Sequence, residues 1–216
     1  MQLNLHQLII PSGHQLLLKD INWQDFEKII EELGDERNIP RISYSQGYLE
    51  LMSPLAIHEF DKTIISDFVK IILEELNIEF SALGSMTLRS KKVRKAVEAD
   101  ECFYIQNEAI IRGKERIDLD IDPPPDLAIE IDITSRTHFD NYEKLAVPEL
   151  WRFDGKELHI SVLHQGVYQN TESSYQFPQF AVKQLIPDYL EKAKTEGRNK
   201  AMKAFRQHIQ HRIYEL

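Results

Sequence analysis

The chain has 216 residues, of which 42% are hydrophobic and 28% are charged, an ordinary composition for a globular protein. No stretch approaches the roughly 18 consecutive apolar residues of a membrane span, and the first residues lack the basic region and apolar run of a signal peptide. The single cysteine, Cys102, excludes a disulfide framework and a cysteine zinc site, so we expect a cytoplasmic protein with no membrane partner. The net charge of −9, from 26 Lys and Arg against 35 Asp and Glu, argues against DNA binding by bulk positive charge.

The first third of the chain is expected to form two hairpins, each followed by a helix. The first hairpin would pair 8–10 with 16–18 through a Pro-Ser-Gly turn. A helix over 22–34 follows, with an asparagine N-cap and a closing glycine. The second hairpin covers 41–52. A long amphipathic helix over 53–76 comes next, with its serine as N-cap and its proline in the first turn.

Short strands dominate the middle of the chain. The pattern predicts strands over 78–83 and 86–89, joined at a glycine. A basic run over 91–95 then leads into a strand at 100–105. Three consecutive prolines directly precede a further predicted strand, over 126–132.

The last third is expected to hold a short helix over about 137–146 and a hairpin of strands 150–153 and 158–162 around an Asp-Gly turn. A polar helix rich in Lys and Arg should run from Pro187 onward.

Strands surrounded by helices, without strict alternation, predict an α+β layered fold with a mixed central sheet flanked by helices. No linker divides the chain. We therefore expect one domain over 1–190, including the N-terminal hairpin and helix region, and a C-terminal polar basic helix over 191–216.

The strand over 126–132 carries the most informative pattern. Alternate side chains of a strand point to opposite faces, about 7 Å apart along one face. One face is apolar and belongs in a core, whereas the other holds three carboxylates: Asp126, Glu130 and Asp132. Burial of such acids requires a compensating cation, and hard oxygen ligands suit Mg²⁺ or Mn²⁺. The alternative is an edge strand whose acidic face meets water.

Asp100 favours the metal interpretation, because it opens the preceding strand and could lie beside Glu130 if the two strands are neighbours. Metal-assisted hydrolysis also needs a nearby basic group to orient water or to stabilise a phosphate. Arg136, His138 and Lys144 lie on or near the helix that follows the acidic strand.

Several segments, taken together, resemble the cyanobacterial, Uma-type family of restriction endonucleases within the PD-(D/E)XK nuclease superfamily. The resemblance spans roughly 10–190, and the segments that carry it are 47–54 with His58, 98–105, 125–131 and 147–155. It implies a restriction-endonuclease-like core, a DNA substrate, a divalent metal and Mg²⁺-dependent hydrolysis of phosphodiester bonds.

Carried over by position, the resemblance implies that Asp100 and Glu130 bind the metal and that Asp126 supports them. His58 and Glu59 would add a further polar group at the start of the long helix. Asp132 would also lie in the metal cluster.

Two positions depart from the family pattern. Asp132 occupies the place of the lysine in the (D/E)XK triplet, and His138 stands where this family usually carries its displaced lysine. Lys144 follows one and a half helical turns later. The resemblance therefore leaves Lys144 or His138 to orient the attacking water or to stabilise charge on the phosphate.

The basic run before Asp100 is the candidate strip for contacts to DNA phosphates. Its members are Lys91, Lys92, Arg94 and Lys95. The alternative for such a run is an ordinary solvated face.

Three functions stay open on this pattern. The first is a Mg²⁺-dependent DNA endonuclease, for which a homodimer would suit the cutting of two strands. The second is a catalytically weakened nuclease fold that binds nucleic acid or a protein partner without cutting. The third is a metal-dependent hydrolase of a small phosphate compound.

Overall fold

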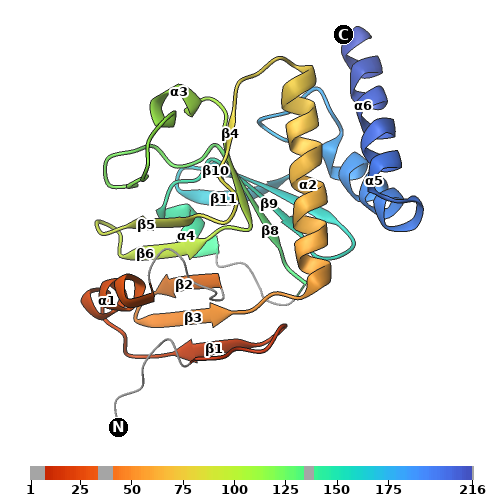
Figure 1. Cartoon of the computed structure of the whole chain (residues 1–216). Helices are drawn as coiled ribbons and strands as arrows, with labels where there is room; N and C mark the ends of the chain where they lie inside the picture. Colours follow the sequence, from red (N-terminus) through yellow and green to blue (C-terminus); the bar gives the residue numbers. More distant parts are fainter. Residues whose placement is uncertain (1–7, 34–40, 134–138, 216) are drawn as a thin grey trace.

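The computed structural model describes residues 8–33, 41–133 and 139–215, and within these ranges the strands form two sheets (Figure 1). All strand pairs of the first sheet are antiparallel. In spatial order this sheet contains β1 (Gln15–Leu18), β3 (Tyr48–Met52), β2 (Arg41–Ser45), β6 (Lys95–Glu98) and β5 (Thr87–Ser90).

The second sheet is mixed, because β8 and β9 run parallel while the other pairs are antiparallel. Its strands, in spatial order, are β11 (Val167–Thr171), β10 (Leu158–His164), β9 (Glu149–Phe153), β8 (Leu127–Ile131), β7 (Glu101–Tyr104) and β4 (Ser81–Ala82). The described helices are α1 (Trp23–Leu33), α2 (Ala56–Glu75), α3 (Glu108–Ile111), α4 (Phe139–Lys144), α5 (Val182–Glu196) and α6 (Arg198–Tyr214).

The two sheets pack against each other, and helices cover their outer faces. On the first sheet, Phe26 of α1 stacks on Tyr44 of β2 with ring centroids 4.6 Å apart. Between the sheets, Val97 of β6 and Ala128 of β8 belong to one buried cluster. The second sheet is covered by α2, α5 and α6, which lie together on one side of it (Figure 1). The α+β prediction, with a mixed sheet flanked by helices, is confirmed.

The hairpin predicted for 8–18 is wrong. Residues 8–10 form no strand, and β1 instead pairs with β3, with Leu17 opposite Glu50. A lone two-stranded hairpin is at best marginally stable in water. By extending the β2–β3 hairpin, β1 instead packs Leu16 and Leu18 against the cluster under α1.

The long helix begins at Ala56 rather than at the predicted Ser53. Its N-cap is Leu55, without a side-chain cap. The backbone of Ser53 is used by the chain before β1: its N–H donates to His14 O at 3.1 Å, and its carbonyl accepts from Gly13 N at 2.6 Å. These two bonds keep Ser53 extended and delay the helix.

The sequence pattern missed β6 and β11 and merged two C-terminal helices into one. The helix expected from Pro187 is α5, which begins at Val182, followed by α6, and the boundary drawn at 190 falls inside α5. Gly197 separates the two helices with φ +98°, a conformation that glycine adopts without strain. None of the described helices is long and apolar enough to span a bilayer.

The C-terminal helix is part of the main core. Phe205 of α6 is fully buried, with its ring centroid 4.4 Å from that of Phe68 in α2. Replacing Phe205 with alanine should lower the free energy of unfolding by about 3–5 kcal/mol, because it removes a buried ring and leaves a cavity. Urea unfolding measures this loss, and Lys203→Ala, an exposed change on the same helix, is the control. An equal midpoint for both variants would contradict the packing of α6.

Candidate functional site

The acidic strand β8 lies inside the second sheet, between β7 and β9, and all five of its residues are buried. Its apolar face, formed by Leu127, Ile129 and Ile131, belongs to the main core, as predicted. The opposite face looks into the space between the two sheets, since Ala128 lies in the inter-sheet cluster. The alternative of an edge strand facing water is therefore wrong.

Asp100, which immediately precedes β7, lies beside Glu130 of β8. The antiparallel register of β7 and β8 pairs Glu101 with Ile129, so the next position places Asp100 beside Glu130. Asp100 is fully buried, and Glu130 is 8% exposed. The Ile131 N–H donates to Asp100 Oδ2 at 2.6 Å, which fixes that carboxylate against β8. The predicted neighbourhood of the two acids is thus present in the structure.

The guanidinium of Arg41 lies between these two carboxylates. Arg41 begins β2, forms an ion pair with Asp100, and places Nη1 3.5 Å from Glu130 Oε2. Two adjacent buried carboxylates repel each other, so a positive group between them offsets a large part of that repulsion. The sequence offered no signal for this contact, because Arg41 comes from a different sheet.

His58 of α2 reaches the same cluster. Its ring is fully buried, with Nε2 3.2 Å from Asp100 Oδ2 and Nδ1 3.4 Å from Glu59 Oε1. Burial lowers the pKa of His58 below its ordinary value, which favours a neutral ring. The contact with the His58 ring holds the pKa of Glu59 down at about 2. His58 therefore contacts Asp100 through Nε2, and Glu59 lies on the other side of the ring, near Nδ1.

Tyr142 of α4 also contacts this acidic cluster, through Glu130. The sequence pattern did not identify it. Its hydroxyl donates to Glu130 Oε1 and is fully buried. Burial, together with the nearby charge of Glu130, raises the pKa of Tyr142 well above its ordinary value. The hydroxyl thus stays protonated and orients Glu130.

The other two acids of the strand have different partners. Asp126 accepts hydrogen bonds from Ile105 N at 2.7 Å and from the backbone and side chain of Asn107. It lies about 13 Å along the strand from Glu130. Asp132 pairs with Arg152 of β9, with Nη1 and Oδ2 3.1 Å apart. The structure therefore brings together Asp100 and Glu130 and keeps Asp126 at the far end.

The predicted basic residues of the α4 region lie apart from the acids or outside the described residues. Lys144 is exposed at the end of α4, and at about 100° per residue it lies about 200° around the helix from Tyr142. Arg136 and His138 lie outside the described residues.

The predicted phosphate strip divides into separate environments. Lys91 Nζ lies 2.9 Å from Glu27 Oε1, and Lys92 Nζ donates to the Asp120 carbonyl at 2.6 Å. Arg94 is exposed in the turn before β6. Lys95 is buried and donates to Ser45 Oγ at 2.5 Å and to Asp140. The four side chains thus have different partners, and their contact with DNA phosphates stays a prediction.

The donor set at Asp100 and Glu130 fits a divalent cation. No group of three or more His, Cys, Asp or Glu side chains within the described ranges is arranged to hold a metal. Mg²⁺, however, is commonly held by one or two carboxylates together with waters and substrate phosphates. Arg41 already places positive charge between the two acids. A cation at this position would have to displace that guanidinium.

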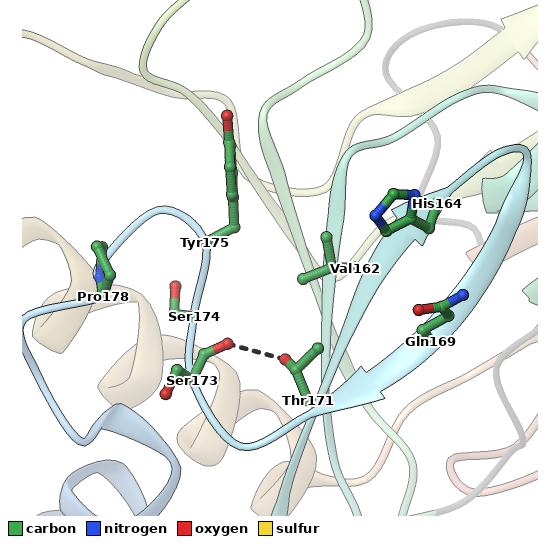
Figure 2. Close-up of a pocket in the computed structure, with 8 residues that line it drawn as sticks. All are labelled: Val162, His164, Gln169, Thr171, Ser173, Ser174, Tyr175 and Pro178. Carbon is green, nitrogen blue, oxygen red and sulfur yellow. Dashed lines mark hydrogen bonds between the residues drawn. The ribbon is translucent and has the colours of Figure 1, made fainter.

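A separate pocket of about 470 Å³ lies on the β10–β11 hairpin and the loop after it. Figure 2 shows its lining, with Thr171 Oγ1 donating to the Ser173 carbonyl at 2.8 Å. The lining residues are Val162, His164, Gln169, Thr171, Ser173, Ser174, Tyr175 and Pro178. None of them belongs to the acidic cluster, so this pocket is distinct from the candidate site.

Comparisons with known proteins bear on the family and the fold. The family model Uma2, described as "Putative restriction endonuclease", matches residues 23–192. No curated protein matches the chain. Among solved structures, the fold is similar to that of "a putative nuclease belonging to DUF820" from Anabaena variabilis ATCC 29413. The identity is 15% and the TM-score 0.53, with 79% of this chain and 99% of that chain covered. At this identity the likeness shows a shared fold, and the match to the family model confirms the resemblance seen in the sequence.

Proposed function

This chain belongs to the Uma2 family of proteins described as "Putative restriction endonuclease", and from that premise we propose that it is a Mg²⁺-dependent DNA endonuclease. The observation that carries the proposal is the buried pair Asp100, just before β7, and Glu130 of β8, with a positive group between them. Burial of two acids side by side opposes folding unless a cation neutralises them. Such a pair is expected where a protein binds a catalytic cation.

In this proposal Asp100 and Glu130 hold Mg²⁺ or Mn²⁺. When bound, the ion polarises the phosphate and lowers the pKa of a water molecule, which makes a nucleophile available at neutral pH. The protein's contribution is to fix the two carboxylates: Tyr142 donates to Glu130, and the Ile131 N–H donates to Asp100. His58 covers the far side of Asp100. These contacts hold both acids in place.

A hollow beside this site supports a nucleic-acid substrate. It has a volume of about 470 Å³ and is lined in part by Arg89, Lys114 and Arg116. Ser85, also in its lining, donates from Oγ to the carbonyl of Asp100 at 3.3 Å, so the hollow adjoins the backbone of the site. Basic side chains beside a nuclease centre are suited to phosphate contacts, and their contribution to binding should fall steeply with added salt.

The proposal is tested by incubating supercoiled plasmid with purified protein in Mg²⁺, in Mn²⁺ and in EDTA. Nicked or linear DNA that forms with metal and is absent with EDTA is expected. Mn²⁺ binding is measured separately by calorimetry without DNA. Metal binding and DNA binding without cutting would support the weakened-nuclease alternative, and cleavage of nucleotides alone would support the small-phosphate hydrolase.

Cutting both strands of a duplex would need two such centres, and we propose a two-fold homodimer for that step. The described residues of one chain hold a single Asp100–Glu130 pair, which is consistent with one strand cut per copy. Light scattering with and without duplex DNA measures the mass. Linear product from a protein that stays monomeric on DNA would contradict the dimer.

A further inference from the structure

Arg152 lies directly beside the proposed metal site, on the strand next to Glu130. The parallel register of β8 and β9 pairs Glu130 with Arg152. Trp151 and Phe153 point into the main core, so Arg152 shares the opposite, inter-sheet face with Glu130 and Asp132. One cationic side chain is therefore built into the acidic face of the sheet.

Two contacts hold the Arg152 guanidinium in place. Its Nη1 donates to Asp132 Oδ2 at 3.1 Å, and its Cζ lies 4.2 Å from the ring centroid of Phe139 in α4. The side chain is 20% exposed. Its buried Nε has no hydrogen-bond partner among the described residues. The guanidinium is thus oriented, yet it keeps an unused donor.

The position of Arg152 relates to Asp132, which stands where the family pattern has a lysine. Asp132 occupies the position at which the triplet would carry a lysine, so the strand itself supplies a negative charge there. The structure offsets that charge, because the guanidinium of Arg152 on the neighbouring strand lies within 3.1 Å of Asp132. A guanidinium at this point offers paired N–H donors that match the geometry of a phosphate.

We propose that Arg152 is a catalytic residue that binds the scissile phosphate and stabilises the negative charge developing on it. This inference rests on the proposed nuclease function. Preorganised donors aimed at developing charge are among the largest contributions to catalysis. Asp132 and Phe139 act as positioning residues that orient Arg152 toward the place of reaction.

Other described cations are less suited to this role. Arg41 lies between Asp100 and Glu130, where the metal would bind. Lys95 is engaged by Ser45 and Asp140. Lys144 is exposed on the side of α4 away from Tyr142. Of these four, Arg152 is the cation that adjoins Glu130 on the neighbouring strand without lying between the two carboxylates.

The test compares kcat for plasmid nicking and Mn²⁺ affinity in a set of variants. Arg152→Met should lower kcat by about 10²- to 10³-fold, the usual effect of removing one charge-stabilising donor. Its Mn²⁺ affinity should stay that of the wild type, because Asp100 and Glu130 are untouched. Asp132→Lys with Arg152→Met, which returns a cation to the triplet position, should recover part of kcat.

Two further variants guard against a purely structural effect. Asp132→Asn with Arg152→Met removes both members of this ion pair, so neither is left without the other; it should fold and remain slow. Lys156→Met removes an exposed cation from the adjoining β9–β10 turn and should cut like the wild type.

The outcomes separate the inference from the proposed function. A wild type that binds no Mn²⁺ and cuts no DNA overturns the nuclease proposal, and this inference with it. Cleavage by Arg152→Met at the wild-type rate overturns the role of Arg152 alone. So does a slow Arg152→Met variant whose Mn²⁺ affinity falls in parallel and which Asp132→Lys does not rescue, because that pattern indicates a structural role.

Discussion

Replacing Glu130 with glutamine should slow Mg²⁺-dependent cleavage by about 10³-fold or more, because a bound metal contributes several kcal/mol of charge stabilisation. Glutamine keeps the shape of the side chain and an oxygen that can accept from the Tyr142 hydroxyl. The change therefore removes the negative charge with little effect on packing. Plasmid nicking at saturating Mg²⁺ measures the loss of rate, and calorimetry measures the accompanying loss of Mn²⁺ affinity.

Asp100→Asn should give the same result, since Asp100 is the other half of the pair. The matched control is Glu157→Gln, which removes an exposed carboxylate from the β9–β10 turn. Cleavage by either site variant as fast as by Glu157→Gln would show that the reaction takes place elsewhere on the protein. A thermal midpoint close to that of the wild type would exclude unfolding as the cause of a slow variant.

The sequence was sufficient for the parts of the site that depend on local pattern. The alternation along 126–132 separates an apolar face from an acidic one, and the structure places those faces as predicted. Asp100 immediately precedes the short strand β7, and its place beside Glu130 follows from the antiparallel register of β7 and β8. Local periodicity fixes which face a side chain takes, so these inferences needed no tertiary information.

The residues that surround the acids could not be found in this way. Arg41 reaches Asp100 from the first sheet, and Tyr142 reaches Glu130 from α4, so both contacts exist only once the layers pack together. Arg152 adjoins Glu130 only because β9 runs parallel to β8. The same limit applies to β1. Its short leucine run fits either a hairpin or an edge strand, and its pairing with β3 depends on the folded β2–β3 hairpin.

Asp126 shows that a residue can lie on the predicted face of a strand and still serve another purpose. Its carboxylate binds the backbone N–H groups of Ile105 and Asn107 and so anchors the loop after β7. Sharing a face with Glu130 is not sufficient for sharing a cation when two acids are four residues apart. Its part in the metal cluster stays a prediction, and the geometry favours the loop contact.

Replacing Arg41 with methionine should produce two effects of opposite sign. Without metal, the variant should lose about 3–5 kcal/mol of unfolding free energy, the usual cost of breaking a buried ion pair, because Asp100 and Glu130 lose their counter-charge. Its affinity for Mn²⁺ should rise, because the incoming ion no longer has to displace a guanidinium. Urea unfolding measures the first effect, and calorimetry with Mn²⁺ measures the second.

The two effects are linked by mass action. A ligand that binds only the folded state stabilises it by about 2.7 kcal/mol at 100 times its dissociation constant. Mn²⁺ should therefore restore most of the stability lost in Arg41→Met, whereas the wild type should gain less at the same Mn²⁺ concentration. Arg212→Met, which removes an exposed guanidinium from α6, is the control and should match the wild type with and without Mn²⁺. If Arg41→Met bound Mn²⁺ no more tightly than the control, Arg41 and the metal would occupy different places, and the carboxylate pair would have to hold its cation elsewhere.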